Sequence, residues 1–290
     1  SYAALKKVDT IIHSAAITDH VGQEDEFEKA NVDGTRNITS LAGLANAALV
    51  HISTTGVSGT QFTLDKRKHG EFDESSFYIG QNYADNVYIN SKFRAEEIVL
   101  EAIELGLNAR IMRVGMLTAT LGGRFQKNPE RNAFANRIAA LCAIACVPVG
   151  MLGANIEMTP VDSCAQAILA LTHNQSPRQA IHHVFNTNTM SLTVLISLLE
   201  QNGNRIEIIS DTAFMEKMTQ LSRQGDFTHV SSLVDDLSNY NSAPQIVITA
   251  STTTQLLSGA GFSWPVIDAA YMGGFLQSIT ANPKQGDKEA

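Results

Sequence analysis

Cysteine and long apolar runs are scarce in this sequence, and each shortage excludes a class of protein. The three cysteines, Cys142, Cys146 and Cys164, are an odd number without CxxC spacing. This excludes a disulfide scaffold and a cysteine-based zinc site, and it fits a reducing compartment. No uncharged apolar run reaches the roughly 18 to 20 residues of a membrane span, and no signal peptide opens the chain. We therefore expect a soluble, cytoplasmic protein without a membrane partner.

Basic residues are also too few for a nucleic-acid partner. The 290 residues carry 21 Lys and Arg against 29 Asp and Glu, a formal net charge of −8, whereas nucleic acids attract basic surfaces. The apolar share of 44% against 17% charged residues is nevertheless enough for a sizeable core. The length predicts a globular protein of about two domains.

Short β-branched runs alternate with helical patterns up to residue 186. We expect strands at Val8–Ile12, Leu49–Ile52, Ala109–Val114 and His183–Asn186. Helices are expected after Asn31, from Asn86 to a stop at Gly106, after Asn132 and over Ala165–Leu171. In the second of these, the side chains assigned to the solvated face are Glu96, Glu97, Glu101 and Glu104. Residues 57–85 have no clear period, so we expect a long irregular excursion there.

The order strand, helix, strand, helix, strand predicts a parallel sheet with crossover helices. Ligands bind such a sheet where the carboxyl ends of the strands and their loops converge. His13 and Ser14 follow the first strand, residues 53–55 follow the second, and Gly115 and Met116 follow the third. These residues are therefore the first candidates for a site.

Tyr88 and Lys92 begin the helix between the second and third strands. Side chains four residues apart share a helix face, so the hydroxyl and the ammonium point into one cleft. A nearby ammonium lowers the pKa of a tyrosine, as a general acid near neutral pH requires. The alternative is a packing aromatic beside a solvated lysine. The spacing alone is weak, because Tyr2 and Lys6 repeat it without a preceding strand.

Seven short segments carry a family resemblance, in the order VDTIIHSAA, NVDGT, HISTTGVSG, YINSK, RVGMLT, GRFQKN and MTPVD. They resemble the extended short-chain dehydrogenase/reductases. Within that group they are most similar to the thioester reductase domains that terminate nonribosomal peptide synthetases and carboxylic acid reductases. The resemblance runs from about Val8 to Asn186 and continues weakly at Gly261–Pro265.

The resemblance implies an α/β fold, with a Rossmann-like parallel sheet and a smaller C-terminal substrate domain. It assigns residues 1–120 and about 159–189 to the Rossmann-like core, and about 121–158 and 190–290 to the substrate domain. The family's unit opens with a strand, a Gly-rich turn and a helix N-terminus that receive the pyrophosphate. Residues 1–290 contain no such segment, and Gly122–Gly123 and Gly259–Gly261 are expected to form turns. The chain is thus expected to start at the family's fourth strand, so that the parallel sheet is N-terminally incomplete by roughly 60 residues.

Carried over residue by residue, the resemblance implies three catalytic side chains. Thr54 matches the catalytic Ser/Thr, Tyr88 the proton donor, and Lys92 the residue that holds the cofactor ribose and tunes the tyrosine. Asn31 matches a position that supports the centre of the sheet, and the alternative is an N-cap for the following helix.

The resemblance also assigns cofactor and substrate contacts. The implied cofactor-binding residues besides Lys92 are His13, Ser14, Ala15, Gly115 and Met116. The family more often has Asn where Met116 stands, so the sequence leaves open whether this side chain makes a contact. Arg124 and Lys127 either attract an anionic carrier arm or are simply solvated.

The function implied is that of an NADPH-dependent reductase. It would release an acyl or peptidyl thioester from the phosphopantetheine arm of a carrier protein as an aldehyde, which a second hydride would convert to an alcohol. The alternatives are another extended short-chain dehydrogenase or epimerase, and a non-catalytic binding module of the same fold. No metal site is expected, because His182 and His183 lack carboxylate or cysteine partners at ligand spacing and read as a strand-edge pair.

Overall fold

The computed structural model describes residues 8–19, 22–59, 61–63, 69–173, 179–223 and 246–280. Tyr2 and Lys6, which repeat the Tyr-xxx-Lys spacing, lie outside the described residues. The contacts divide the chain into two compact units. Unit 1 comprises residues 1–115, 166–185 and 244–263, and unit 2 comprises residues 116–165, 186–243 and 264–290.

Unit 1 is built on a four-stranded parallel sheet in the order β1, β2, β4, β9. The strands are β1 (Thr10–His13), β2 (Ala48–Thr54), β4 (Ala109–Val114) and β9 (Ile181–Val184). The predicted α/β fold with its Rossmann-like parallel sheet is confirmed. β4 has the predicted bounds, whereas β1 begins two residues later and β9 two residues earlier than expected.

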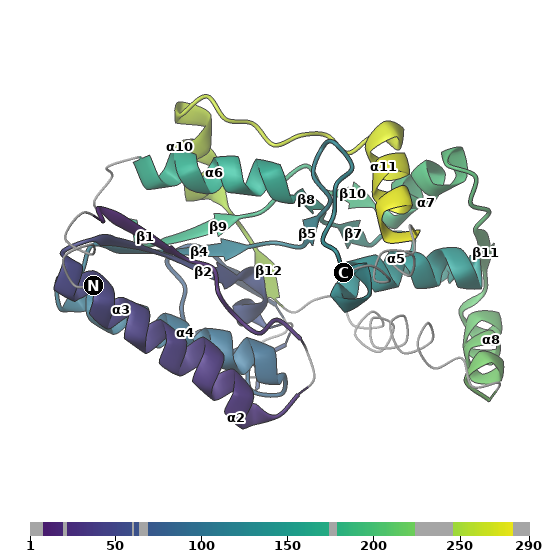
Figure 1. Ribbon diagram of the computed structural model, residues 1–290. Coiled ribbons are helices and arrows are strands. Elements are labelled where there is room, and N and C mark those ends of the chain that lie inside the picture. Colours follow the sequence, from purple (N-terminus) through teal and green to yellow (C-terminus); the bar gives the residue numbers. More distant parts are fainter. Residues whose placement is uncertain are drawn as a thin grey trace, which may run out of the picture. The chain divides into compact units, whose positions relative to one another are not determined.

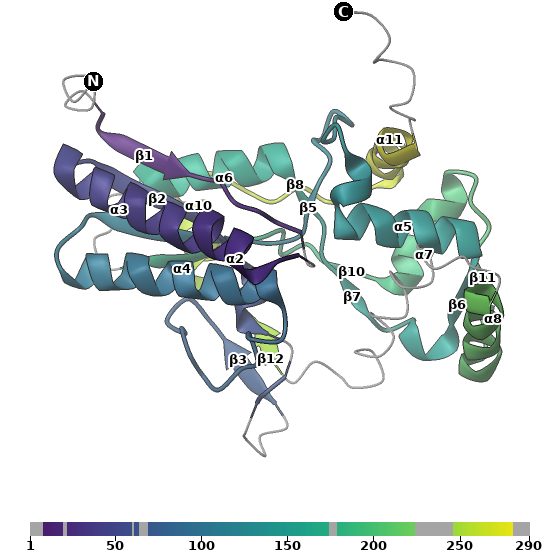
Figure 2. The same cartoon turned by 60° about the horizontal axis from the view of Figure 1, so that its bottom comes forward.

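Helices cover both faces of this sheet (Figures 1 and 2). α3 (Gly34–Ala45) and α4 (Val87–Glu104) lie along one face, and α6 (Val161–His173) and α10 (Ser251–Gly259) lie along the other. α6 belongs to unit 1 from Gln166 onward. One core cluster under α3 and α4 consists of Ala42, Leu49, Val99, Ala109, Ile111 and Ile181. β4 and β9 are almost wholly buried between these helices, whereas two of the four residues of β1, at the edge of the described sheet, are exposed.

The ends of α4 are set by two residues that the sequence predicts. The Asn86 side chain accepts the N–H of Ile89 at 3.1 Å, which satisfies a free donor of the first turn. Past the last helical residue, Gly106 takes a positive φ of 99° and donates its N–H to Ile103 O at 2.9 Å. A glycine takes this conformation without a steric penalty, so the helix ends there.

The excursion between β2 and α4 contains structure that the sequence does not predict. A 3₁₀ turn, η2 (Thr55–Ser58), follows β2, and β3 (Gly70–Phe72) pairs in parallel with β12 (Ile246–Ile248). A strand of three residues is too short to show a period. An apolar cluster holds this region together, and its buried members are Val57, Phe62, Phe72, Phe93 and Ile246.

α3 does not begin directly after the loop that follows β1. It is preceded by α2 (Glu24–Phe27) and by a π-helical segment, η1 (Glu28–Asp33). Phe27 and Val32 are buried there. These two segments and α3 follow one another without a break and form one continuous run of helical backbone.

Unit 2 consists of helices and of two-stranded pairs. The pairs are β5 (Leu117–Thr118) with β8 (Thr159–Pro160), β6 (Cys146–Pro148) with β11 (Glu207–Ile209), and β7 (Asn155–Ile156) with β10 (Met190–Ser191). The helices are α5 (Ala133–Ile144), α7 (Leu192–Gln201), α8 (Asp211–Arg223) and α11 (Ala269–Thr280). Short 3₁₀ turns occupy Pro129–Arg131 and Val149–Met151. The predicted turn at Gly123 is present, with a φ of 76°.

The cysteines are free thiols, and Cys146 and Cys164 are buried like other small core side chains. Across the described ranges, no helix combines the length and the apolar character that crossing a membrane requires. In the same part of the chain, no group of His, Cys, Asp and Glu side chains is arranged to hold a metal ion.

Candidate active site

Three polar side chains gather at the carboxyl end of β2. Thr54 ends the strand, and its hydroxyl accepts the N–H of Gly56 at 3.1 Å. Tyr88 stands in the first turn of α4 and shares a hydrogen bond with the Thr54 hydroxyl. Lys92 follows one turn later, and its Nζ donates to Ile52 O of β2 at 2.7 Å. The structure thus brings together the three side chains for which the sequence suggests catalytic roles.

The Lys92 ammonium is buried against β2. The side chain is only 4% exposed, and Nζ lies 3.4 Å from Nε2 of His51. Burial lowers the pKa of Lys92 to about 8, and the Glu96 carboxylate opposes this shift. A lysine with this pKa is mostly protonated at neutral pH and can still exchange its proton.

The pKa of Tyr88 moves in the opposite direction to the prediction. Burial raises the pKa of its hydroxyl to about 12, and the hydrogen bond with Thr54 offsets part of this rise. The prediction was that Lys92 would lower the pKa, but its Nζ binds the Ile52 carbonyl instead and desolvation dominates. Tyr88 is therefore a protonated hydroxyl, which is the state that a proton donor needs.

Two histidines on neighbouring strands lie beside the ammonium. His13 and His51 are register partners in β1 and β2, and their ring centroids are 5.4 Å apart. The Thr35 hydroxyl donates to a backbone carbonyl, so His13 Nε2, at 3.2 Å from Thr35 Oγ1, is the donor to it. Burial and the Lys92 charge lower the pKa of both rings. His51 was not predicted, because a histidine inside an apolar strand gives no signal of its own.

The Asn31 side chain ties the loop after β1 to the first turn of α4. Its Oδ1 accepts Ile17 N at 2.8 Å, and its Nδ2 donates to Ile17 O at 2.9 Å and to Ser91 Oγ at 2.8 Å. The Ser91 hydroxyl in turn donates to Tyr88 O at 2.8 Å. Asn31 lies inside η1 and Asp33 is the residue before α3, so the N-cap alternative was wrong.

The other cofactor candidates of unit 1 lie at the ends of β1 and β4. Ser14 and Ala15 are exposed in the loop directly after β1. Gly115 follows β4, and its N–H donates to Val184 O of β9 at 3.1 Å. These residues and His13 therefore lie at the carboxyl edge of the same sheet as Thr54, where a parallel sheet binds its ligands.

Met116 is the first residue of unit 2, and a carboxylate holds its backbone. Its N–H donates to Glu157 Oε2 at 2.6 Å, and the Thr159 hydroxyl donates to the same carboxylate. Burial raises the pKa of Glu157 to about 7, although hydrogen bonds from Met116, Thr159 and Asn186 counteract it. A lone Glu before the MTPVD segment carries no motif, so the sequence does not predict this group.

Arg124 and Lys127 are exposed side chains of unit 2. Arg124 closes a tight turn with Thr120, in which Thr120 N donates to Arg124 O at 2.8 Å and Arg124 N donates to Thr120 Oγ1 at 2.9 Å. Gly123 completes this turn and approaches Gly274 of α11, where an added Cβ would lie 3.3 Å from the Gly274 Cα. The turn fixes the backbone of Arg124 and leaves its guanidinium in solvent.

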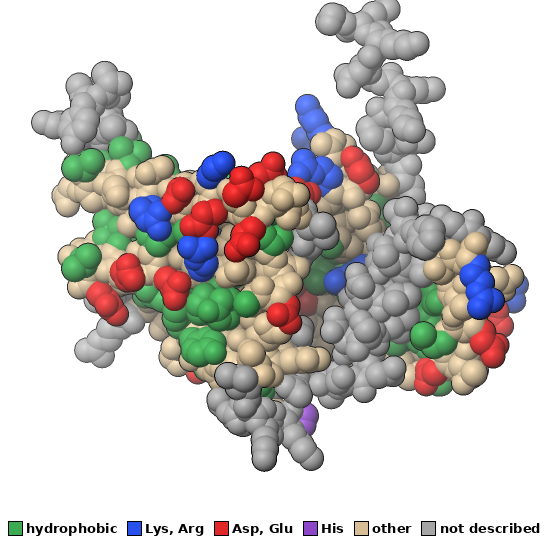
Figure 3. All heavy atoms as spheres, turned by 90° about the horizontal axis from the view of Figure 1, so that it is seen from below, with side chains coloured by type: hydrophobic (Ala, Val, Ile, Leu, Met, Phe, Trp, Pro, Cys, Tyr) green, Lys and Arg blue, Asp and Glu red, His purple; other side chains and the backbone are tan. Residues whose placement is uncertain are grey.

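The predicted solvent-facing side of α4 is wrong at one residue, Glu96. Glu97, Glu101 and Glu104 are exposed, and charged side chains of both signs are interspersed on the face seen in Figure 3. Glu96, in contrast, is fully buried and pairs with Arg113 of β4, which is also fully buried. Arg113 Nη2 lies 2.8 Å from Glu96 Oε2, and its Nε lies 3.1 Å from both carboxylate oxygens.

The two consecutive histidines of β9 are buried in an edge strand of the described sheet, as predicted. His183 Nδ1 donates to Thr249 O at 2.6 Å. Burial lowers the pKa of His182 to about 4, and the Arg110 charge contributes in the same direction. Both rings are therefore neutral structural groups around neutral pH.

Comparisons with known proteins point to one family. The family model described as "Male sterility protein", an NAD-binding family, matches residues 1–168. A thiolation-reductase di-domain from an archaeal non-ribosomal peptide synthetase is 27% identical with a TM-score of 0.83, over 97% of this chain and 59% of that chain. The reductase domain of the aureusimine biosynthetic cluster is 30% identical with a TM-score of 0.78, over 94% of this chain and 68% of that chain.

A curated relative is longer by far than this chain. Glycine betaine reductase ATRR of Emericella nidulans is 28% identical over 212 residues, which are 71% of this chain, and the match spans 16% of that protein. The resemblance to reductase domains that the seven segments carry is confirmed by these matches. The match over residues 1–168 covers more than half of the sequence, and the chain therefore belongs to the NAD-binding male sterility protein family.

Proposed function

We propose that this chain is an NADPH-dependent reductase that releases a carrier-bound acyl or peptidyl thioester as an aldehyde. The observation that carries the proposal is the hydrogen-bonded pair of Thr54 and Tyr88, with the Lys92 ammonium one helical turn away. Two hydroxyl donors at the carboxyl edge of a parallel sheet suit a carbonyl oxygen on which negative charge develops. The family match and the two reductase-domain structures support the same chemistry.

The residues at the ends of β1, β2 and β4 fit the nicotinamide end of a dinucleotide. Ser14 and Ala15 are small and exposed, which leaves their backbone open to a flat ring. The Lys92 ammonium has three N–H donors, of which one binds Ile52 O, and another would hold the ribose. The described residues contain no Gly-rich turn between a strand and a helix N-terminus, the segment that receives the pyrophosphate in a dinucleotide-binding unit. When bound, the cofactor supplies a hydride to the carbonyl carbon. The preference for NADPH over NADH follows from the family resemblance alone.

The chain's own residues then handle the oxygen and its proton. Thr54 and Tyr88 would donate hydrogen bonds to the thioester carbonyl oxygen. As charge develops on that oxygen, Tyr88 transfers its proton to it and is left as a phenolate. The hydroxyl proton then returns to the Tyr88 phenolate as the carbonyl re-forms, and the carbon–sulfur bond breaks with its electron pair on sulfur. The thiolate takes up a proton from solvent, which leaves an aldehyde and the carrier thiol. A second hydride transfer to the aldehyde would give an alcohol.

Unit 2 is proposed to receive the substrate and its carrier. Arg124 and Lys127 are exposed cations in a chain with a net charge of −8. The phosphopantetheine arm carries a phosphate, which arginine and lysine both bind. These two side chains are thus the proposed contacts of the arm.

The test is turnover of an acyl-pantetheine thioester, followed by NADPH oxidation and by detection of the aldehyde. Tyr88→Phe should lower turnover by ~10²-fold or more and leave NADPH affinity nearly unchanged, because a positioned proton donor contributes about 10² to 10⁴. Tyr83→Phe is the matched control, since Tyr83 stacks on Phe93 with centroids 3.8 Å apart and belongs to the apolar cluster. Unchanged turnover in folded Tyr88→Phe protein would remove this tyrosine from the mechanism.

A further inference from the structure

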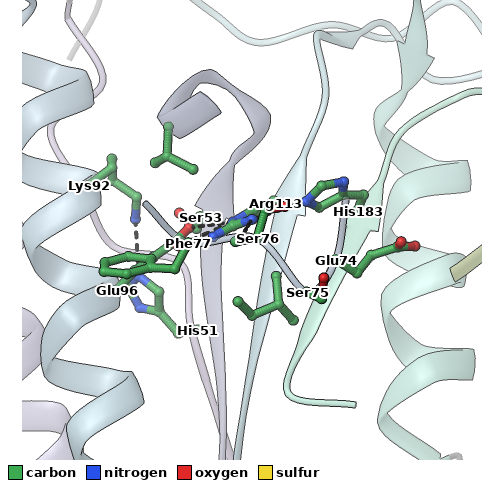
Figure 4. A network of polar contacts seen from close by, with 12 residues as sticks. His51, Ser53, Glu74, Ser75, Ser76, Phe77, Lys92, Glu96, Arg113 and His183 are labelled. Carbon is green, nitrogen blue, oxygen red and sulfur yellow. Dashed lines mark hydrogen bonds and ion pairs between the residues drawn. The ribbon is translucent and has the colours of Figure 1, made fainter. Parts of the chain in front are cut away.

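A chain of buried polar groups crosses unit 1 beside the proposed catalytic residues (Figure 4). It runs from Ser53 of β2 through Glu96 of α4 and Arg113 of β4 to His183 of β9. The Ser53 hydroxyl donates to Glu96 Oε1 at 2.5 Å. Ser53 directly precedes Thr54, and Glu96 stands one turn after Lys92. The strand that carries Thr54 and the helix that carries Tyr88 are therefore joined by a side-chain hydrogen bond.

Each polar group in this network has its partners. Arg113 Nε and Nη2 bind Glu96, while Nη1 donates to Ser76 O at 2.9 Å and to His183 Nε2 at 3.1 Å. His183 can accept at Nε2 because its Nδ1 proton is donated to Thr249 O at 2.6 Å. The guanidinium is held from three sides, so the Glu96 carboxylate that it binds has one orientation.

Stability alone does not explain such a pair. Replacing a fully buried ion pair with apolar side chains of similar volume is often neutral or stabilising, because both charges lose their hydration. What the pair supplies is geometry, since a planar guanidinium binds a carboxylate with two parallel hydrogen bonds. An apolar contact between β2 and α4 has no such directional preference.

We propose that Ser53, Glu96 and Arg113 are positioning residues that set the placement of the Thr54 hydroxyl relative to the Tyr88 hydroxyl. The inference rests on the proposed reductase function, because it assigns these residues a role in the same reaction. Arg113 orients Glu96, and Glu96 holds the end of β2 through Ser53. A misplacement of about 1 Å between reacting groups can cost 10²-fold in rate, so a fixed strand end matters to turnover.

The first test compares two Ser→Ala variants, each of which removes one buried hydroxyl group. Ser53→Ala removes the bond to Glu96, and we expect kcat to fall between about 10- and 10²-fold while KM and NADPH affinity change little. Ser58→Ala is the matched control, because Ser58 is also buried but its hydroxyl donates to Gly59 O at 3.0 Å, away from Glu96. Thermal unfolding of both variants measures what each serine contributes to stability. Equal kcat in the two folded variants would overturn the proposal.

The second test separates positioning from stability. The double variant Glu96→Leu with Arg113→Met removes both charges, and we expect a folded protein that binds NADPH and has a kcat at least about 10-fold lower. Wild-type kcat in the folded double variant would show that the network is only structural. If the double variant does not fold, the Ser53→Ala and Ser58→Ala pair decides. Failure of the proposed function is distinguishable, because the wild-type protein would then lack thioester turnover altogether.

Discussion

Replacing Lys92 with Met should make the protein more stable at neutral pH while removing its activity. Lys92 is 4% exposed, and its ammonium is held in a site whose carbonyl and imidazole only partly replace water. Methionine keeps the length and the apolar stem of the side chain and lacks the charge. The variant therefore tests whether the buried charge is maintained at the expense of stability.

The magnitude follows from the pKa of this lysine. Its lowering from 10.5 to about 8 by burial corresponds to about 3 kcal/mol against the charged form. Met in its place removes the donor that lies 2.7 Å from Ile52 O. The unpaired carbonyl costs about 1 to 3 kcal/mol of folding free energy. The expected net gain at pH 7 is about 0 to 2 kcal/mol, and the pH dependence is the sharper signature.

The sign of that dependence is fixed by which state releases the proton first. Below pH 8 both the folded and the unfolded wild-type chain carry the Lys92 proton, so the full cost of the buried ammonium is present. Between pH 8 and 10.5 the folded state releases the proton first, the unfolded state binds more protons, and wild-type stability rises with pH. The advantage of Lys92→Met over wild type should therefore shrink by about 3 kcal/mol across this window.

Urea unfolding followed by circular dichroism at pH 7 and pH 10.5 measures the free energy of unfolding of wild type and Lys92→Met. The contributions of the other titrating groups cancel in the difference between the two proteins. Lys29→Met serves as the control, because the Lys29 side chain is 76% exposed and its replacement removes no buried charge. A Lys92→Met difference that is the same at both pH values would refute the reasoning, since it would mean that the ammonium is solvated in the folded protein.

Two further predictions concern the Thr54 hydroxyl and a glycine turn. Thr54→Val keeps the β-branched shape and deletes one donor, so thioester turnover should fall by ~10² to 10³ with an unchanged circular dichroism spectrum. Loss of activity in Thr55→Val but not in Thr54→Val would shift the assignment by one residue. Gly59→Ala should lower the melting temperature more than Gly106→Ala, although both glycines have positive φ, because only at Gly59 does an added Cβ meet Asn82 O, at 2.4 Å. Equal melting temperatures would contradict the close approach of these two segments.

The parallel sheet and its crossover helices could be predicted because their signals are local. β4 is a run of six residues with the predicted bounds, and α4 starts after Asn86 and ends before Gly106 as expected. The missed strands are the short ones. β3 has three residues and pairs with β12, which lies far along the chain, so tertiary contacts and not a sequence period define it.

The candidate site could be predicted only where a motif marks it. Tyr88, Lys92 and Thr54 belong to segments with a family resemblance, and the structure brings them together. Glu157 could not be found, because its contact with Met116 joins residues 41 apart. The predicted direction of the Tyr88 pKa shift was wrong because it too depends on tertiary contacts. The shift is set by burial and by the partner that Lys92 takes in the fold.

α4 turns polar side chains toward the sheet, which is the face that an amphipathic helix normally makes apolar. Tyr88, Lys92 and Glu96 recur at intervals of four residues and therefore share one side of the helix. A rule that assigns every charged side chain to solvent fails on this side, because each buried charge has a partner from another element: the Ile52 carbonyl for Lys92 and Arg113 for Glu96. The departure from local amphipathicity thus marks the proposed site. A helix with leucine at the two charged positions would regain the apolar stripe and lose both the ammonium beside Tyr88 and the bond that holds the end of β2.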